Sequence, residues 1–275
     1  MKRILTLTLL ATIMLCAACD KIDDKDMLRR AGAIGTWYDD NQGVADHSQR
    51  AFLEKYTGCR CINCPTADDV ITEALANYGG RLIAVAVHTG SYAYPFTGEP
   101  DLRTEVGTIW NDHFQFNSYP VALLNRTGEP FVPTTNFNSR IDGLLSHEAS
   151  LALAAECTTL DDGSLDITSH LEFLKDVSGD LTITLLIMED GIVTSQKMPD
   201  NSTQSNYVQN HVLRDVITSE WGNPVDADGK KDTRRYVTFN YETKDNWNLD
   251  RCHIVVFVSN KDTKEILNVC ETKVR

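Results

Sequence analysis

The stretch Cys61-Ile62-Asn63-Cys64-Pro65 decides how the first half of this chain folds. It follows an apolar run, residues 51–56, that is typical of a β-strand, and it opens an amphipathic segment, residues 67–78, that is typical of a helix. A helix N-terminus carries partial positive charge, which lowers the pKa of a thiol placed there and favours the thiolate. The spacing therefore predicts a redox pair in which Cys61 attacks and Cys64 resolves a mixed disulfide.

The same cysteines have two other interpretations. Cys61 and Cys64 could form a purely structural disulfide, or they could bind zinc together with Cys59 and a histidine such as His88 or His113. Zinc needs four converging ligands, usually from two spaced pairs, and the sequence has no second Cys-x-x-Cys and no His-x-x-x-His. We therefore expect neither a metal nor a cofactor.

The N-terminus has the features of an export signal. Two basic residues, Lys2 and Arg3, precede an apolar run over residues 4–14, and Ala17-Ala18 then precede Cys19. The apolar run is too short to span a bilayer, which takes about 20 residues. Residues 1–18 resemble a lipoprotein signal peptide, so Cys19 is expected to become the lipidated first residue. The alternative is a plain secreted protein that is cut nearby.

The segment after Cys19 is charged and has no core-forming pattern, so residues 19–45 are expected to form an acidic tether. Its start, residues 20–26, resembles the surface-export signal of Bacteroidetes lipoproteins; a solvated linker is the alternative. These features predict an outer-membrane location through a lipid anchor, and the resemblance to the surface-export signal would place the protein at the cell surface.

Composition excludes some classes of partner. The chain has 275 residues, a net charge of −13 and a pI near 4.9, which argue against nucleic acid and against anionic lipid surfaces. With 42% hydrophobic residues it can bury a full core, and its length suggests one or two domains.

Residues 46–147 alternate between strand and helix patterns. The apolar residues of 67–78 recur at helical spacing, and Gly79-Gly80 follows them. The predicted elements, in order, are a strand at 51–56, a helix at 67–78, a strand at 82–87, a helix at 102–113, strands at 121–124 and 131–132 with a turn at 126–129 between them, and a helix at 141–145. Strand, helix, strand, helix, strand, strand, helix is the order of a thioredoxin-like domain.

Residues 148–275 instead favour an all-β, sandwich-like domain. Period-two or wholly apolar runs recur, separated by Asp-Gly and Gly-Asp turn signals. The predicted strands lie at 151–155, 165–167, 181–187, 192–198, 237–241, 253–259 and 264–273.

Six cysteines remain after the signal peptide and Cys19. Cys252 and Cys270 flank the last predicted hairpin at equal distances from residue 261, which would place them opposite each other and within disulfide reach. The alternative is two buried free thiols in a shifted register. Cys59 and Cys157 are left, either free or paired with each other.

Several stretches taken together resemble the Bacteroidetes lipoproteins related to outer membrane protein twenty-eight. They are residues 52–58 before the Cys-x-x-Cys-Pro, Tyr119-Pro120 before a strand that ends in Asn125-Arg126, residues 207–214, Trp221-Gly222 and residues 255–258. The resemblance covers nearly all of the chain after the signal. It implies a thioredoxin-like domain followed by a β-rich domain on a lipid anchor.

Tyr119-Pro120 also resembles the cis-proline loop of thioredoxin folds, where Pro120 would shape a peptide groove facing the cysteine pair. Two positions depart from that pattern. Arg60 stands where a tryptophan usually precedes the first cysteine, and Lys55 stands where a buried acid is expected. Arg60 would favour a thiolate at Cys61, while the missing acid makes substrate reduction less efficient.

Two functional hypotheses follow. The first is thiol–disulfide exchange on the thiols or disulfides of exported proteins, with the direction of electron flow open. The second is a non-catalytic surface module in which the β-rich domain binds a partner or forms a homodimer and Cys61–Cys64 is structural. His211 is expected to pack or hydrogen-bond within the second domain, with a role in a site as the alternative.

Overall fold

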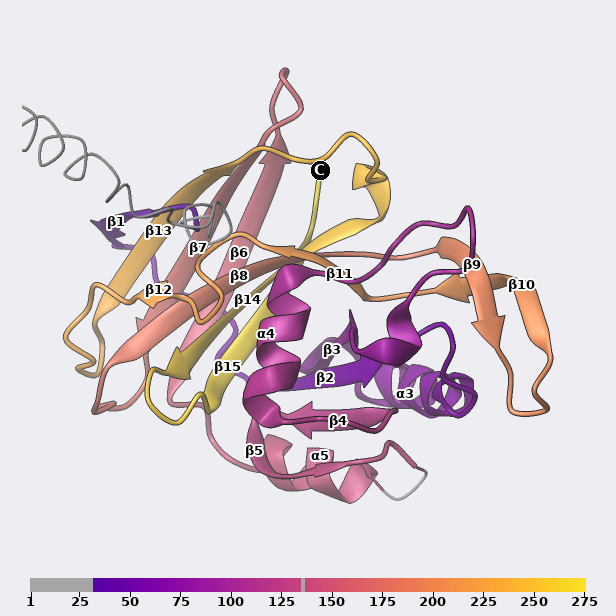
Figure 1. Cartoon of the computed structure of the whole chain (residues 1–275). Helices are drawn as coiled ribbons and strands as arrows, with labels where there is room; N and C mark the ends of the chain where they lie inside the picture. Colours follow the sequence, from indigo (N-terminus) through magenta and orange to yellow (C-terminus); the bar gives the residue numbers. More distant parts are fainter. Residues whose placement is uncertain (1–31, 135–136) are drawn as a thin grey trace, which may run out of the picture. The chain divides into compact units, whose positions relative to one another are not determined.

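The computed structural model describes residues 32–134 and 137–275, and residues 32–275 form one compact unit (Figure 1). Its strands and helices are β1 Thr36–Asp39, β2 Ala51–Thr57, α3 Cys64–Tyr78, β3 Leu82–His88, α4 Glu105–Phe114, β4 Val121–Leu124, β5 Thr127–Phe131, α5 Asn138–Leu145, β6 Leu151–Thr159, β7 Leu165–Phe173, β8 Leu181–Glu189, β9 Ile192–Lys197, β10 Thr203–Gln209, β11 Val212–Val216, β12 Asn223–Pro224, β13 Arg234–Tyr241, β14 Cys252–Asn260 and β15 Ile266–Lys273. Short 3₁₀ turns lie at Gly79–Arg81, Ser91–Ala93 and Leu249–Arg251.

The first half has the element order that the sequence predicts, β2-α3-β3-α4-β4-β5-α5. β2 pairs in parallel with β3 and antiparallel with β4, and β4 pairs antiparallel with β5. Both β2 and β3 are buried at every residue, because helices cover both faces of the sheet. Phe52 and Tyr56 pack with the α4 side, while Ala51 and Leu53 pack with α3 and α5.

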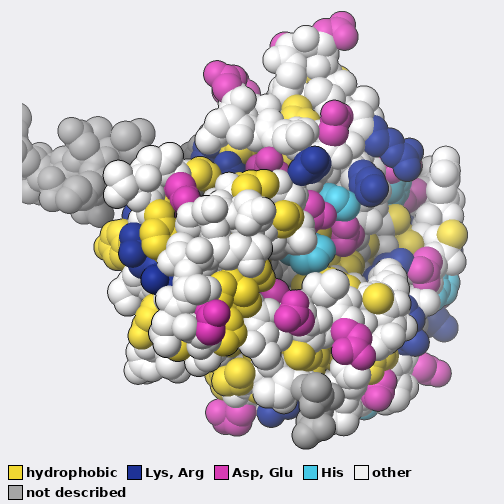
Figure 2. All heavy atoms as spheres, turned by 90° about the vertical axis from the view of Figure 1, so that its right-hand side faces the viewer, with side chains coloured by type: hydrophobic (Ala, Val, Ile, Leu, Met, Phe, Trp, Pro, Cys, Tyr) yellow, Lys and Arg dark blue, Asp and Glu magenta, His cyan; other side chains and the backbone are white. Residues whose placement is uncertain are grey.

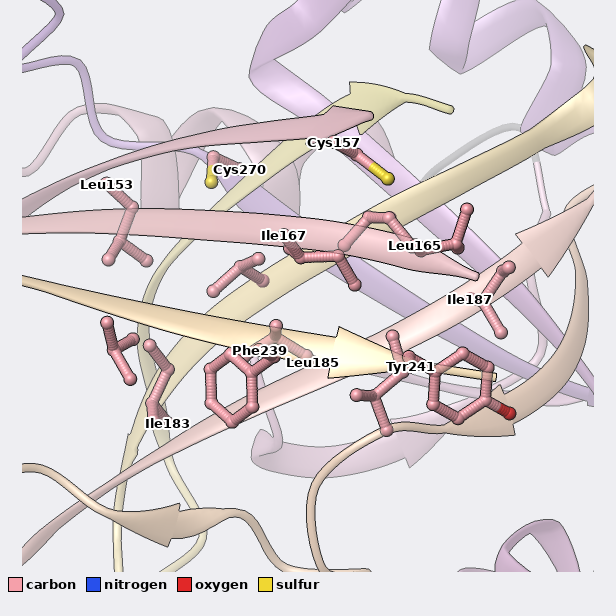
Figure 3. Close-up of a cluster of buried hydrophobic side chains, with 14 of the residues drawn as sticks. Leu153, Cys157, Leu165, Ile167, Ile183, Leu185, Ile187, Phe239, Tyr241 and Cys270 are labelled. Atoms are coloured by element: carbon pink, nitrogen blue, oxygen red, sulfur yellow. The ribbon is translucent and has the colours of Figure 1, made fainter. Parts of the chain in front are cut away.

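The second half is built mainly of strands, as predicted, and its core lies between two sheets. Strands β1, β13, β7 and β6 form a four-stranded sheet in that order. Figure 3 shows side chains of β6 and β7, such as Leu153 and Ile167, in one cluster with Ile183 and Leu185 of β8. Alternate side chains of each strand point into this cluster, which explains the period-two pattern of the sequence.

The two halves share a single sheet. Its order is β15-β14-β8-β11-β3-β2-β4-β5, with β12 paired to β8. The junction is the parallel pairing of β11 with β3, where Val212 lies opposite Ala86 and the Ala86 N–H donates to the His211 carbonyl at 2.7 Å. Strands from both sides of the predicted boundary near residue 147 therefore lie in one sheet. The boundary itself stays a prediction.

Two expectations need correction. Residues 32–45 belong to the compact unit and not to the expected tether, because β1 pairs with β13 from Thr36 to Asp39 and Val44 is buried. The sequence did not predict β1 because this strand is short, lies at the edge of a sheet and has most of its residues exposed.

The second correction concerns Cys252 and Cys270, which are both free in the structure. The β14–β15 hairpin is present, but its turn lies further along the chain than residue 261 and a bulge follows Val258. Cys270 therefore lies opposite Val256, and Cys252 lies opposite Glu189 of β8. Pairing symmetric about residue 261 does not occur, because the turn is centred further along the chain, and this register separates the two thiols.

An ion pair is buried between the sheet and α4. Arg126 donates from Nε and Nη2 to the two carboxylate oxygens of Glu54 at 2.8 and 2.7 Å, and the two side chains are 1% and 0% exposed. The guanidinium lies 4.6 Å from the ring centre of Trp110, 5.4 Å from that of Trp221 and 5.2 Å from that of Phe257. Aromatic rings from both halves of the chain therefore surround one cation.

Arg126→Met should lower the free energy of unfolding by about 3–5 kcal/mol, because it leaves the Glu54 carboxylate buried without its partner. Urea unfolding followed by tryptophan fluorescence measures the loss. Lys230→Met is the matched control, since the Lys230–Asp176 pair is 67% exposed on both sides and should change stability by about 1 kcal/mol or less. Equal effects of the two variants would contradict a stabilising role for the buried pair.

Candidate functional site around the Cys61–Cys64 disulfide

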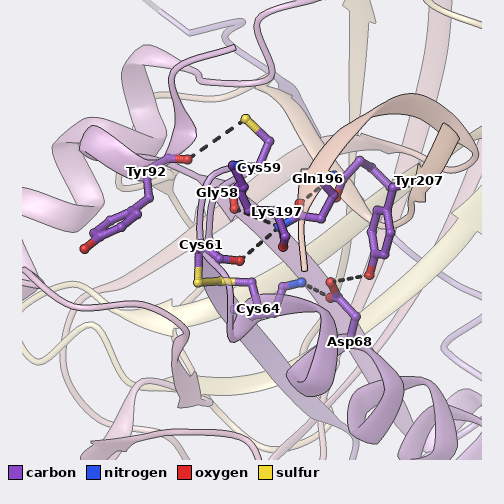
Figure 4. Close-up of a disulfide and its surroundings, with 11 residues drawn as sticks. Gly58, Cys59, Cys61, Cys64, Asp68, Tyr92, Gln196, Lys197 and Tyr207 are labelled. Atoms are coloured by element: carbon purple, nitrogen blue, oxygen red, sulfur yellow. Dashed lines mark hydrogen bonds and ion pairs between the residues drawn. A yellow bond between two sulfur atoms is a disulfide. The ribbon is translucent and has the colours of Figure 1, made fainter. Parts of the chain in front are cut away.

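Cys61 and Cys64 are joined by a disulfide in the loop between β2 and α3, with their Cα atoms 5.4 Å apart (Figure 4). The Cys61 N–H donates to the Gly58 carbonyl at 3.0 Å, and the Cys64 N–H donates to the Cys61 carbonyl at 3.3 Å. These bonds close a tight turn before the helix. Both cysteines are buried, at 3% and 0% exposure, so the pair is covered by neighbouring chain.

The loop after β3 covers one side of the motif. The Arg60 N–H donates to the Tyr92 carbonyl at 2.8 Å. Position 58 requires glycine for this approach, since a Cβ there would lie 2.4 Å from the Tyr92 backbone. Tyr92 and Tyr94 are 46% and 55% exposed, and Ile62 within the motif is 37% exposed. The motif thus carries a rim of exposed apolar and aromatic side chains.

The peptide bond between Tyr119 and Pro120 is cis, as the sequence predicts. Pro120 is buried and directly precedes β4. The Tyr119 ring packs edge-on against the Tyr92 ring at 6.0 Å, and its hydroxyl donates to Asn111 Oδ1 at 2.7 Å. The proline loop therefore lies beside the loop that touches the cysteine motif.

The Arg60 side chain is held by the loop after β3, and its expected effect on a Cys61 thiolate stays a prediction. Its Nε donates to the Tyr94 carbonyl and its Nη2 to the Pro95 carbonyl, each at 2.8 Å, and its guanidinium lies 4.4 Å above the Phe96 ring. These contacts hold the guanidinium group of Arg60 against the loop after β3. Arg60 fixes that loop against the motif and is not held at the sulfur atoms.

The other side of the motif is covered by a hairpin from the second half of the chain, formed by β9 and β10. The Lys197 N–H donates to the Cys59 carbonyl at 2.8 Å, and the Gln196 Nε2 donates to the Cys61 carbonyl at 3.0 Å. Figure 4 shows Gln196 and Lys197 on the side of the motif away from Tyr92. Sequence reasoning missed these residues, because nothing local in a strand pattern indicates a contact so far along the chain.

A charged pair made of a buried lysine and a partly exposed aspartate lies beside the motif. Lys55, 4% exposed, forms an ion pair with Asp68, which lies one helical turn after Cys64. The other carboxylate oxygen of Asp68 accepts from the Tyr207 hydroxyl at 3.0 Å, so the hairpin reaches this pair too. Burial lowers the pKa of Lys55 to about 7. In the sequence, the i, i+4 spacing of Cys64 and Asp68 on the predicted helix was the one signal that could have placed Asp68 near the cysteine motif.

His88 lies beside Lys55 and is only 2% exposed, with no partner on either ring nitrogen. Burial, and then the charge of Lys55, lowers the pKa of His88 to about 3, so the imidazole is neutral. His88 and Cys59 line a cavity of about 10 Å³. Cys59 is a free thiol that donates to the Tyr94 carbonyl at 3.2 Å, and burial raises its pKa.

The zinc interpretation does not fit this arrangement. Cys61 and Cys64 are bonded to each other, and within residues 32–134 and 137–275 no group of three or more candidate ligands could hold a metal ion. His113 lies apart from the motif, against the rings of Phe114 and Trp221. His211 lies where β10 turns into β11, with its Nδ1 3.3 Å from Asp190.

Acidic and basic side chains are interspersed on the face of the molecule shown in Figure 2. In the part of the chain that the structure describes, no helix is long and apolar enough to cross a membrane. Cys19 and the predicted signal peptide lie outside the described residues.

Comparison with protein families gives a match to the model described as outer membrane protein Omp28 over residues 108–275. The chain belongs to the Omp28 family. Membership confirms the predicted resemblance and the predicted outer-membrane location. The matched range begins after Cys64, so it does not include the cysteine motif. A comparison with curated protein sequences gives no match.

The first two of the following solved structures have a similar fold at low sequence identity. HBP35 of Porphyromonas gingivalis is 15% identical, with a TM-score of 0.67 over 84% of this chain and 77% of that chain. Protein AGR_C_4864 of Agrobacterium tumefaciens is 15% identical, with a TM-score of 0.52 over 83% and 96%. A domain of the outer membrane lipoprotein Omp28 of P. gingivalis is 18% identical, with a TM-score of 0.33 over 46% and 89%. The fold is therefore that of HBP35, a mixed α/β structure.

The lowered pKa of Lys55 predicts a pH effect on stability. Between about pH 7 and the pKa of an unfolded lysine, near 10.4, the unfolded chain binds a proton that the native chain has released, so native stability rises with pH. In urea unfolding from pH 7 to 9.5, the wild type should gain up to about 1.4 kcal/mol per pH unit relative to Lys55→Met. The exposed Lys230→Met variant should follow the wild type, and parallel curves for wild type and Lys55→Met would refute the effect.

Proposed function

We propose that the protein carries out thiol–disulfide exchange on exported proteins from a lipid anchor in the outer membrane. The observation that carries this proposal is the Cys61–Cys64 disulfide at the start of α3, in a sheet of order β3-β2-β4-β5 that α3 and α5 cover on one face and α4 on the other. This arrangement and the cis Tyr119–Pro120 bond before β4 support a thioredoxin-like domain.

The chemistry uses two electrons held by the cysteine pair. With the pair reduced, the Cys61 thiolate attacks a substrate disulfide, one substrate thiolate leaves, and Cys61 is joined to the substrate. Cys64 then loses its proton, attacks Cys61 Sγ and displaces the second substrate thiolate, which restores the Cys61–Cys64 disulfide. The positive end of α3 favours the Cys61 thiolate. The reverse sequence oxidises a substrate dithiol.

The alternative function is a non-catalytic surface module, and burial of the disulfide favours it. A substrate sulfur has to reach Cys61, which is only 3% exposed, while the exposed Ile62, Tyr92 and Tyr94 offer an apolar rim for a peptide. A structural disulfide would be covered in the same way without any need for access. Activity measurements separate the two functions.

In glutathione buffers, the Cys61–Cys64 pair should cycle between dithiol and disulfide at a potential of roughly −120 to −270 mV, the range of known exchange enzymes. Cys64→Ser should trap substrates as mixed disulfides on Cys61, which mass spectrometry after non-reducing isolation detects. Cys59→Ser is the control, and it should leave both exchange and potential unchanged. A wild-type pair that stays oxidised over this range, with nothing trapped by Cys64→Ser, would leave the structural module as the function.

Cys19→Ala should release a folded, soluble protein, because the compact unit begins at Gly32 and the two acyl chains at Cys19 would supply the membrane attachment. Fractionation of the cell envelope, with circular dichroism of the released protein, makes the measurement. A Cys19→Ala protein that still pellets with membranes after a salt wash would mean that the folded unit itself holds the membrane.

A further inference from the structure

A chain of buried amide and hydroxyl groups runs along the inner side of the β9–β10 hairpin. Gln196 and Gln209 are 2% and 4% exposed. Gln209 Nε2 donates to Gln196 Oε1 at 3.1 Å and to Thr194 Oγ1 at 3.2 Å, which leaves the Gln196 amide nitrogen directed away from Gln209. Gln196 Nε2 donates to the Cys61 carbonyl at 3.0 Å and to the Lys197 carbonyl at 3.1 Å. Its orientation is thus fixed from both ends.

The hairpin is also held independently of Gln196. The Lys197 N–H bonds the Cys59 carbonyl, the Ser195 N–H donates to Glu99 Oε2 at 2.8 Å, and the Tyr207 hydroxyl bonds Asp68 on α3. These contacts lie on the motif, on the loop after β3 and on the helix. Removing the Gln196 side chain alone should therefore leave the hairpin in place.

The Cys61 carbonyl is the acceptor that matters for the sulfur chemistry. It accepts the Cys64 N–H, and this bond closes the turn that brings Cys64 back to Cys61. Gln196 adds a second donor to the same oxygen, from a side chain that does not belong to the motif. A carbonyl with two lone pairs can accept both bonds at once, so the turn is held by its own backbone and by the hairpin.

We propose that Gln196 is a positioning residue for the Cys61–Cys64 pair, through which the second half of the chain sets the equilibrium between dithiol and disulfide. The proposal deepens the proposed thiol–disulfide exchange and rests on it. The turn is closed in the disulfide, whereas in the dithiol it is free to open and lose the bond from Gln196 to the Cys61 carbonyl, so this bond stabilises the disulfide more than the dithiol. Gln196 therefore favours the disulfide.

The coupling has to act in both directions. If the hairpin stabilises the closed turn of the disulfide, the disulfide stabilises the docked hairpin by the same factor. Reduction of Cys61–Cys64 should then increase the rate of hydrogen exchange at hairpin amides such as those of Ser195 and Lys197. Amides of β13, which lies in the other sheet, should not respond.

The test compares the mature chain with Gln196→Ala, Gln196→Glu and Gln204→Ala. Gln204 lies opposite Gln196 on the same hairpin but is exposed, which makes it the matched control. The equilibrium constant for disulfide formation against glutathione, read by alkylation and mass spectrometry, should fall about five- to tenfold in both Gln196 variants, the value of one hydrogen bond. An ionised glutamate cannot donate to the carbonyl, so Gln196→Glu should not rescue at a pH where the side chain is ionised. Gln204→Ala should match the wild type.

Equilibrium constants within twofold of wild type in both folded Gln196 variants would overturn the proposal. If Gln196→Ala undocks the hairpin, the proposal is tested on the wild type alone. Identical hydrogen exchange at Ser195 and Lys197 in the oxidised and reduced wild-type proteins would then overturn the proposal. The equilibrium constant does not depend on catalysis. A protein without exchange activity whose constant still shifts in the Gln196 variants would refute the proposed function and keep the positioning role.

Discussion

The outer backbone edge of β3 is the constraint on which the rest of the molecule depends. β3 is buried at every residue, so the peptide groups on the side away from β2 have to bond to protein rather than water. β11, from late in the sequence, pairs with this edge at Ala86, and in the same sheet it lies next to β8, which pairs with β14. Since β9 and β10 lie between β8 and β11 in the chain, this pairing also brings their hairpin to the cysteine motif.

The adjacent charged residues Glu54 and Lys55 of β2 point to opposite faces of the sheet and form separate ion pairs. Glu54 points towards α4 and bonds Arg126 among aromatic rings, whereas Lys55 points towards α3 and pairs with Asp68. Alternation along the strand forces this division. The first pair joins the two halves of the core, and the second lies beside the disulfide and receives Tyr207 from the hairpin. Both charges are buried because each has a partner within reach.

Local patterns were sufficient to predict most of the fold. The largely apolar run of β2, the continuous apolar run of β3, the helical spacing of α3 and the alternation in β6 and β8 each depend on neighbours within a few residues. The predictions that were wrong concerned features that depend on pairing between strands distant in the sequence. β1 is too short and too exposed to show a pattern, and Cys270 was assigned the wrong partner because the turn of the hairpin is centred further along the chain than residue 261. Likewise, Cys61 and Cys64 were evident from the sequence, while nothing in it indicated that Gln196 and Tyr207 contact this region, although Tyr207 belongs to a stretch that carries the family resemblance.

The junction between β3 and β11 has a consequence for the order of events during export. A chain that crosses the inner membrane from its N-terminus presents Cys61 and Cys64 before residues 192–216 have emerged. Until then β3 has an open edge and the motif lacks its hairpin, so oxidants and chaperones of the periplasm meet a nascent form whose thiols are more accessible than in the finished protein. Once the last third of the sequence has emerged and folded, the cysteine pair is less accessible to other proteins of the periplasm than it was in the nascent chain.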